Sequence, residues 1–419
     1  MIKTKNREIV NKIDFKETVL SKQKNLQESA ALGHQLIDWE RAKDFNVWDT
    51  DGNKYIDMTA GIFVANAGHA NPEIKTAIQE QLNKDLWFSF LYNSQIKTDF
   101  ISRLLEISPD HFEKAVLLSS GSEVTDIAIK LIKFWAIKNN RKYTISFRGS
   151  YHGRTLGADL LCGNEDSTDW SGLKDNSIKF IDFPPKGSSF DPSILPDPKD
   201  IAAFFLETYQ GWGALMYPEE YIRDLYSFAR ENGILVCFDE IQAGFYRMGT
   251  LYGYMSYGDY IKPDLVCLAK GLSSSLPMSA LLGTKELIDI HKKAVVGGTH
   301  AGNALCCAAS LANINLLTSQ RFQNHLTDKI PLFETLFNDL LKSPLIADIN
   351  CRGMVSGVLF YDEKTATSVA KRCIQNGILP VYTGRNSIKF GPPLTITKDA
   401  IIEAVSVLET CLEQEQNGL

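Results

Sequence analysis

The chain has 419 residues, of which 44% are hydrophobic and 22% are charged, and its formal net charge is -6. That length and composition predict a globular protein with two domains, and the acidic balance argues against nucleic acid or an anionic membrane as a partner. The start of the chain has no apolar core of a signal peptide, and no run long enough to span a membrane occurs, so we expect a cytoplasmic protein. The cysteines and histidines lack ligand spacing, and no metal site is expected.

In chain order, the first predicted element is a hairpin within residues 45–58, with its turn at Asp51-Gly52. The middle of the chain then alternates apolar strands with amphipathic helices. Strands are expected at 115–118, 143–147, 201–207, 234–240 and 264–270, and helices after residue 121 and within 217–233. This alternation predicts an α/β fold with a mostly parallel sheet sandwiched by helices.

The two ends of the chain differ from the middle and predict a second domain. Short strands are expected at 357–362 and 387–391, among helical segments. We therefore predict a large domain over residues 60–310 and a smaller α+β domain formed by residues 1–59 and 311–419.

In parallel sheets, ligands bind beyond the carboxyl ends of the strands. Four charged side chains stand at such ends: Glu207, Asp239, Glu240 and Lys270. Lys270 directly follows the apolar run Leu265–Ala269. A lysine at that position is either solvated or a covalent catalyst held on a rigid element.

Other features favour the catalytic interpretation. The small-residue loop "SSGSEVTD" (119–126) opens a helix, where free backbone N–H groups can hold a phosphate. Asp239 ends a buried strand, and an acid at that position is either a helix cap or the partner of a buried cation. A carboxylate, a lysine and a phosphate cradle are the parts that pyridoxal phosphate requires of a protein.

The sequence resembles the class III (omega) aminotransferases of the pyridoxal-phosphate fold type I over roughly residues 40–410. Seven segments carry the resemblance in the same order: "VWDTDGNKYIDMTAGIFVANAGHANPEI", "SSGSEVTD", "SYHGRT", "FDEIQAGFYRMG", "DLVCLAKGLSSSLP", "GGTHAGNALCCAA" and "IKFGPPLTIT". The resemblance implies a seven-stranded-type sheet in the large domain, pyridoxal 5'-phosphate as cofactor, a Schiff base on Lys270 and Asp239 at the ring nitrogen. It also implies a homodimer.

The resemblance assigns further residues to the cofactor. Tyr151 would stack on the ring, Gln242 would lie near the ring hydroxyl, and Thr299 would reach the phosphate of the neighbouring subunit. The remaining cofactor candidates are Ser120, Gly121 and Ser122 at the phosphate, with His152 and Glu207 close to the ring. Glu240 is expected to be a structural hydrogen-bond partner rather than a proton carrier.

The sequence departs from its relatives at two positions. Amino-acid-specific relatives usually carry an acid where this chain has Trp212, and that acid pairs with an arginine where this chain has Lys389. A lysine still binds an anion, but as a point charge without the bidentate fork of arginine. Arg385 is a second anion candidate, and Phe63 and Trp87 are candidates for the substrate pocket. An alternative remains open, in which another side chain replaces the arginine and the substrates are conventional.

The expected activity is ping-pong transfer of an amino group from a primary amine or amino acid, with a distal or anionic group, to a keto acid. The same scaffold also hosts lyases and amino-acid racemases or epimerases, because all need the same carbanion. A non-catalytic module that only binds the cofactor is the alternative of another class. Nothing in the sequence supports that alternative, since the lysine is present and no DNA-binding extension occurs.

Overall fold

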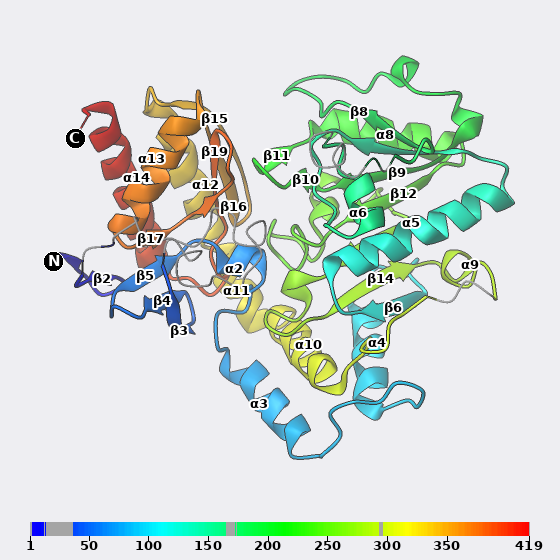
Figure 1. Ribbon diagram of the computed structural model, residues 1–419, viewed down its shortest axis with the longest axis horizontal. Helices are drawn as coiled ribbons and strands as arrows, with labels where there is room; N and C mark the ends of the chain where they lie inside the picture. The colour runs from blue at the N-terminus through cyan, green and yellow to red at the C-terminus, as the bar shows by residue number, and fades with distance from the viewer. Residues whose placement is uncertain are drawn as a thin grey trace. The chain divides into compact units, whose positions relative to one another are not determined.

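The computed structural model describes residues 2–11, 13, 37–164, 172, 174–292 and 296–418, and the chain divides into two compact units (Figure 1). Unit 1 comprises Met1–Asn71, Trp212–Ala214 and Gln320–Leu419. Unit 2 comprises Pro72–Gly211 and Leu215–Ser319. The domain boundaries placed at residues 60 and 310 from the sequence remain a prediction. Within the described residues, no helix is both long and apolar enough to cross a membrane.

Unit 2 is built on a seven-stranded sheet, as the sequence predicted. Its strands, in spatial order, are β6 (Lys114–Leu118), β14 (Ser279–Gly283), β13 (Leu265–Leu268), β12 (Leu235–Asp239), β9 (Ile201–Glu207), β7 (Tyr143–Phe147) and β8 (Ile178–Ile181). Only β14 runs antiparallel to its neighbours, β13 and β6. Every residue of β9, β12 and β13 is buried, which explains why these strands are continuous apolar runs.

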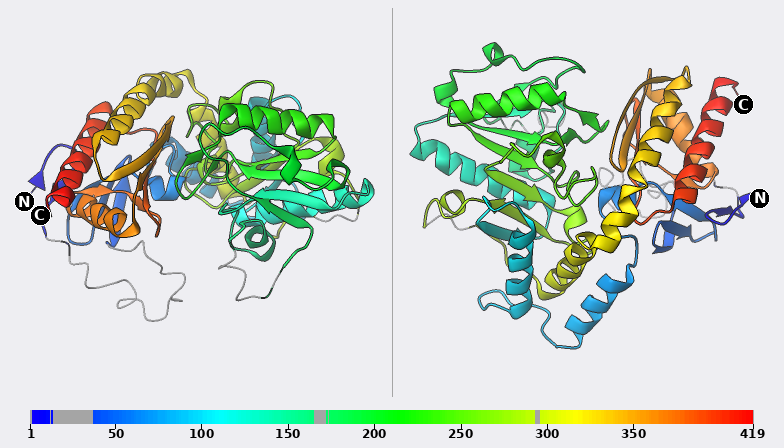
Figure 2. Two further views of the ribbon diagram at one scale, coloured as in Figure 1. Left: turned by 90° about the horizontal axis from the view of Figure 1, so that it is seen from above. Right: turned by 180° about the vertical axis from the view of Figure 1, so that it is seen from behind.

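Two long helices cover opposite faces of this sheet, as the left view of Figure 2 shows for α8 (Glu219–Glu231) in green and α5 (Gly121–Lys138) in cyan. Helix α5 starts with a capping box between Ser120 and Glu123. The other elements of unit 2 are α3 (Pro72–Leu82), α4 (Gln95–Ile107), α6 (Leu156–Leu160), α9 (Lys285–Ile288), α10 (Ala304–Leu317), β10 (Tyr209–Gln210), β11 (Leu215–Met216) and the 3-10 helices η2 (Pro192–Ile194), η3 (Pro198–Asp200), η4 (Gly253–Tyr257) and η5 (Lys270–Leu272).

Unit 1 contains two small sheets. One has strands β1 (Ile2–Lys3), β2 (Glu8–Ile9), β5 (Lys54–Asp57), β4 (Asn46–Asp49) and β3 (Trp39–Lys43), with β17 (Ile378–Leu379) beside β5. The other has β15 (Ile346–Arg352), β16 (Val355–Phe360), β19 (Ser387–Phe390) and β18 (Val381–Tyr382) in that order. The helices of unit 1 are α2 (Ala60–Phe63), α11 (Gln320–Thr327), α12 (Ile330–Asp339), α13 (Glu363–Gln375) and α14 (Lys398–Gln416), with the 3-10 helix η6 (Leu340–Lys342).

The short element α2 is a left-handed turn. All four of its residues have positive φ, from 47° at Ala60 to 63° at Phe63. Three of the four carry side chains, so this backbone is strained. Thr59 holds the turn, because its hydroxyl accepts a hydrogen bond from Gly61 N at 2.9 Å and its carbonyl accepts one from Phe63 N at 2.8 Å. Strain of this kind clusters at ligand-binding segments, and Phe63 is one of the substrate candidates predicted from the sequence.

Lys329 is a buried cation of unit 1 that holds the segment after β19. Its Nζ donates hydrogen bonds to the carbonyl oxygens of Leu394 (2.6 Å) and Ile396 (2.9 Å). Desolvation lowers the pKa of Lys329 from 10.5 to about 7, and the negative charge of Asp44 opposes that shift. Between pH 7 and 10.5 the unfolded chain therefore binds more protons at this site than the folded one.

We expect the stability of the wild type, relative to Lys329→Met, to rise with pH across that window. Each pH unit contributes up to about 1.4 kcal/mol, because folding releases a proton there. Melting temperatures of both proteins at pH 6, 7, 8 and 9 measure the effect, and below pH 7 the difference should be flat. A difference that is constant from pH 6 to pH 9 would contradict the low pKa of Lys329.

Candidate active site

Lys270 lies immediately after β13, at the start of η5, and its φ of 45° is in the left-handed region. Asn313 on α10 holds the following turn, because its Nδ2 donates to the carbonyl oxygens of Gly271 (2.8 Å) and Leu272 (2.9 Å). Desolvation lowers the pKa of Lys270, and the carboxylates of Asp239 and Glu207 counteract that shift. A lysine with a lowered pKa has more of the neutral amine that attacks a carbonyl.

Asp239 ends β12 and is buried beside a buried histidine. Its Oδ2 lies 2.7 Å from His152 Nδ1, and its Oδ1 accepts a hydrogen bond from Ile241 N at 3.0 Å. A carboxylate has about four acceptor positions, so these two bonds leave room for another donor. Within the described residues, Nε2 of His152 is buried without a hydrogen-bond partner. His152 thus orients the Asp239 carboxylate through a single hydrogen bond, from its Nδ1 side.

Glu207 ends β9, the strand next to β12. Its two carboxylate oxygens accept hydrogen bonds from Tyr151 N (3.2 Å) and Gly211 N (3.0 Å). Desolvation raises the pKa of Glu207 to about 7, and the nearby charge of Asp239 adds to the rise. A Cβ on Gly211 would lie 2.8 Å from Glu207 Oε1 and 3.5 Å from Gln242 Nε2, so Gln242 lies close to the same group.

The predicted phosphate loop lies at the N-terminus of α5. The hydroxyl of Ser120 is used to cap the helix, since it accepts from Glu123 N. The N–H groups of Gly121 and Ser122 belong to the first turn and are available to an anion. Ser122 Oγ accepts a hydrogen bond from Arg154 N at 3.1 Å, which leaves its own proton to donate. Gly153 permits this approach, because a Cβ there would lie 2.3 Å from Ser122 Oγ.

Two neighbours of these residues have structural roles. Glu240 is buried and accepts hydrogen bonds from Gly253 N (2.6 Å), Tyr254 N (2.8 Å) and the hydroxyl of Thr208. Desolvation raises the pKa of Glu240 to about 7 in spite of these bonds. Asn313, which fixes the turn after Lys270, was missed in the sequence, because an asparagine inside an apolar helix gives no local signal of its distant partner.

The structure does not bring every candidate to this cluster. Tyr151 is 49% exposed, and the Arg154 guanidinium lies 5.8 Å from the centre of its ring. Thr299 lies in an exposed turn before α10, and Trp87 is 54% exposed. No hydrogen bond or ring contact among the described residues joins Thr299 or Trp87 to Asp239 or Lys270.

The other substrate candidates lie together in unit 1. Lys389 on β19 is buried, and its Nζ lies 4.9 Å from the centre of the Phe63 ring. A Cβ on Gly391 would lie 1.7 Å from Phe63, so this glycine admits the ring to the end of β19. Trp212 follows Gly211 in the chain, and its carbonyl accepts a hydrogen bond from Ser387 Oγ at 3.2 Å.

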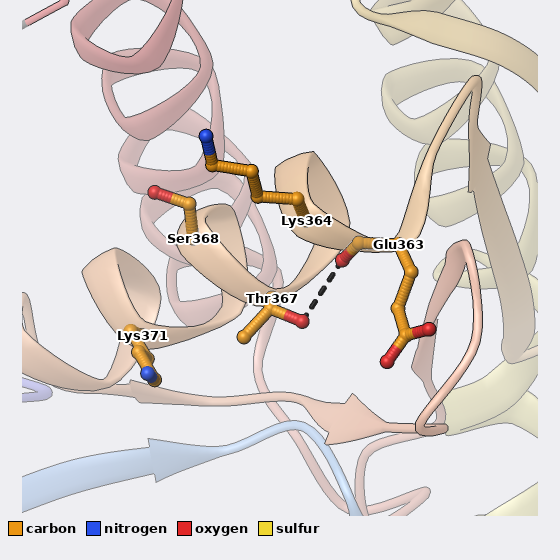
Figure 3. A pocket seen from close by; sticks show the side chains of 5 residues that line it. All are labelled: Glu363, Lys364, Thr367, Ser368 and Lys371. Carbon is orange, nitrogen blue, oxygen red and sulfur yellow. Dashed lines mark hydrogen bonds between the residues drawn. The ribbon is translucent and has the colours of Figure 1, made fainter.

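A surface pocket on α13 is a weaker candidate for the active site than the residues around Lys270 (Figure 3). It is lined by Glu363, Lys364, Thr367, Ser368 and Lys371. The hydroxyl of Thr367 donates to the carbonyl of Glu363, and the hydroxyl of Ser368 donates to Glu415. These bonds occupy the hydroxyls in local contacts, and the lining residues present no paired nucleophile and base.

Solved structures with the same fold include transaminases. The omega transaminase from Pseudomonas jessenii in complex with PMP has a TM-score of 0.86 at 22% identity, covering 96% of this chain and 99% of that one. The ornithine aminotransferase from Toxoplasma gondii ME49 has a TM-score of 0.84 at 24% identity, covering 96% and 100%. The fold is that of the pyridoxal-phosphate enzymes of fold type I.

The model of the family "Aminotransferase class-III" matches residues 29–412, and the chain belongs to that family. An acetylornithine aminotransferase of Bacillus subtilis is 31% identical, covering 91% of this chain and 96% of the relative. An isoleucine 2-epimerase of Lentilactobacillus buchneri is 29% identical, covering 93% of each. The chain is thus a class III aminotransferase that uses pyridoxal phosphate and acts on small molecules.

The residues of unit 2 fit this cofactor. Lys270 would provide the amine, Asp239 has acceptor positions left that a ring N–H could use, and the start of α5 has N–H donors that would suit the phosphate. Gly153 and Gly211 keep the backbone close to Ser122 and Glu207, where a Cβ would collide. The half-exposed ring of Tyr151 leaves a face for stacking.

Proposed function

We propose that Lys270 and Asp239 are the catalytic residues of a ping-pong transamination between an amine or amino acid and a keto acid. The observation that carries this assignment is the lowered pKa of Lys270 beside Asp239, which itself is held by His152 at 2.7 Å. When bound, pyridoxal phosphate supplies an electron sink for the carbanion formed at the substrate carbon. Lys270 would hold the cofactor covalently, and its amine, once free, would carry the proton of the substrate carbon.

The other residues around Lys270 bind and orient the cofactor. Asp239 would accept the proton-bearing ring nitrogen as its partner, and His152 fixes the orientation of that carboxylate. We assign the phosphate to Gly121 and Ser122, with Ser120 as the helix cap behind them, and ring stacking to Tyr151. Glu207 and Gln242 complete the cofactor residues, because Gly211 brings their side chains close together.

For the substrates, we propose Lys389 as an anion-binding residue with Phe63 and Trp212 as apolar walls. The ammonium of Lys389 is buried over the Phe63 ring, where a negative group interacts with it more strongly than in water. Trp87 is a further candidate for the wall. The relatives named above act on amino acids, and a 2-aminoadipate transaminase of Pseudomonas putida is 29% identical over 94% of this chain. Their substrates suggest amino and oxo acids as the first compounds to test.

We propose further that the enzyme works as a cytoplasmic homodimer, with Thr299 at the cofactor phosphate of the neighbouring subunit. Support comes from an exposed apolar segment of unit 2 that includes Trp87, Phe88 and Phe90. The Phe88 ring lies 5.3 Å from the His300 ring, next to Thr299. An exposed apolar segment of this kind is typical of a surface that a partner covers.

A half-reaction tests the proposed activity. The purified protein with its cofactor is mixed with single amines and amino acids, without a keto acid, while the visible spectrum and the products are followed. We expect conversion of the cofactor to its amine form, with one equivalent of carbonyl product. Return of the original spectrum with accumulation of the inverted amino acid or of ammonia would instead show an epimerase or a lyase. Lys270→Ala, tested with the same compounds, is the control that links either reaction to the site.

A further inference from the structure

Lys270 stands between two fixed parts of the backbone. Before it, the chain is held in the sheet as far as the end of β13 at Leu268. After it, the carbonyl oxygens of Gly271 (2.8 Å) and Leu272 (2.9 Å) both accept hydrogen bonds from Nδ2 of Asn313 on α10. The position of Lys270 is therefore fixed from both sides, by the sheet and by one side chain of α10.

The backbone of Lys270 depends on such a support. Its φ of 45° lies in the left-handed region, which costs free energy for a residue with a side chain. The bonds to its own carbonyl oxygen are long, because Ser273 N and Ser274 N both lie 3.3 Å from that atom. The two shorter bonds from Asn313 fix the peptide planes that follow Lys270. Asn313 therefore favours one direction of the Lys270 Cα–Cβ bond, from which the amine extends.

Helix α10 holds the Asn313 amide rigidly. Asn303 caps the start of the helix, since its Oδ1 accepts hydrogen bonds from Leu305 N (3.0 Å) and Cys306 N (3.3 Å). Asn313 itself lies three turns further on and is fully buried. A donor on a packed helix keeps its geometry better than a donor on a loop.

The amide of Asn313 is poorly suited to stabilise an apolar helix. Its Oδ1 is buried and has no hydrogen-bond partner among the described residues, and the same holds there for the hydroxyl of Ser310, one turn earlier on α10. Burial of polar groups with unmet hydrogen bonds costs free energy. Exceptions of this kind are expected where a function requires a particular residue. The partners of Nδ2, directly after Lys270, point to that function.

We infer that Asn313 is a positioning residue for the reaction, which acts through the backbone of Lys270 rather than on the substrate. This inference rests on the proposed role of Lys270 as the covalent lysine. Attachment forms a C=N bond between the Lys270 amine and the aldehyde carbon of the cofactor and releases water, and the free amine must later reach the proton of the substrate carbon. Both steps depend on the direction of one side chain, and a displacement of about 1 Å at a reacting group can cost about 10²-fold in rate.

The test uses Asn313→Leu, which removes both donors at a similar volume. The matched control is Asn46→Leu in unit 1, because Nδ2 of Asn46 is also buried and also donates to two carbonyl oxygens, those of Asn6 (2.8 Å) and Tyr55 (2.9 Å). The full-length proteins, freed of cofactor, are mixed with pyridoxal phosphate and quenched at intervals with borohydride, which reduces the C=N bond. Mass spectrometry then identifies the labelled lysine and the rate of its labelling. We expect attachment at Lys270 to slow by about tenfold or more in Asn313→Leu and to stay within about twofold in Asn46→Leu, although both variants lower the melting temperature.

Steady-state kinetics of the cofactor-loaded proteins gives a second readout. Asn313→Leu should lower kcat by about 10- to 100-fold and change KM for the amine donor by less than about threefold, because the residues that bind the substrate remain in place. Asn46→Leu should leave both values within about twofold. Asn313→Ala carries the same test if leucine prevents folding, since it removes the donors without adding bulk.

The outcomes separate the role of Asn313 from that of Lys270. Equal losses of attachment rate in Asn313→Leu and Asn46→Leu would show a general effect of stability and would overturn the role of Asn313. A wild-type rate of attachment in Asn313→Leu would overturn it as well, and in both cases the label on Lys270 would leave the proposed function intact. A label on another lysine in the wild type would instead refute the proposed function of Lys270, and the role of Asn313 with it.

Discussion

Replacement of Lys270 by alanine is expected to lower kcat by at least about 10³-fold, because it removes the proposed covalent attachment and the proposed proton carrier. Alanine is tolerated by the surrounding structure, since the turn after Lys270 is held by Asn313 through backbone carbonyls of Gly271 and Leu272. Steady-state turnover with the best donor from the half-reaction measures the loss.

The matched control for this variant is Lys262→Ala, which removes an exposed lysine of the same unit that lies before β13. The control should keep wild-type kcat and melting temperature. The absorption spectrum gives a second readout, because Lys270→Ala should bind the cofactor without the spectrum of a lysine adduct. Turnover above about a tenth of the wild-type rate in Lys270→Ala would exclude Lys270 as the catalytic lysine.

Replacement of Asp239 by asparagine is expected to lower kcat by about 10³-fold as well. The amide has nearly the same shape, but it carries no charge to hold a proton on the ring nitrogen, and each pKa unit lost there corresponds to about 1.4 kcal/mol. The side chain of His152 remains next to position 239 and against Phe205, so most of the packing stays unchanged. Kinetics of the half-reaction with a fixed donor measures the effect without the second substrate.

Asp259→Asn, at an exposed position of unit 2, is the control for the removal of a carboxylate and should be active.

Glu240→Gln tests a structural carboxylate, because Glu240 accepts three hydrogen bonds and an amide has only one acceptor oxygen. It should lower the melting temperature, whereas Asp239→Asn should lower kcat more than stability. Asp239→Asn with kcat within tenfold of the wild type would mean that another group holds the ring proton.

Much of unit 2 follows from local sequence. The strands with residues buried on both faces, such as β9 and β12, appear as uninterrupted apolar runs, and α8 lies within the predicted range 217–233. Polar groups at the ends of those strands are expected to meet, because parallel strands place their carboxyl ends at one edge of the sheet. The meeting of Lys270, Asp239 and Glu207 was predictable for this reason.

The contacts of unit 1 were less accessible to sequence reasoning. Neither the left-handed turn at Ala60–Phe63 nor the seating of Phe63 against Gly391 has a local signature. Lys329 resembles any other lysine in the sequence, yet it is buried with two carbonyl partners from a segment more than sixty residues away. The contact of the Arg385 guanidinium with the Trp212 ring likewise joins residues that are far apart in the chain.

The sequence alone determined the order of strands and helices, the family and the chemical identity of the lysine, the carboxylates and the phosphate loop, because these depend on periodicity and on short motifs. Only the tertiary structure decided which buried groups interact, including His152 with Asp239, Asn313 with the turn after Lys270 and Lys329 with Leu394. The pKa values of Lys270, Glu207 and Lys329 belong to this second group. Desolvation and through-space charge depend on distances between residues remote in sequence, and those distances are fixed by packing rather than by local pattern.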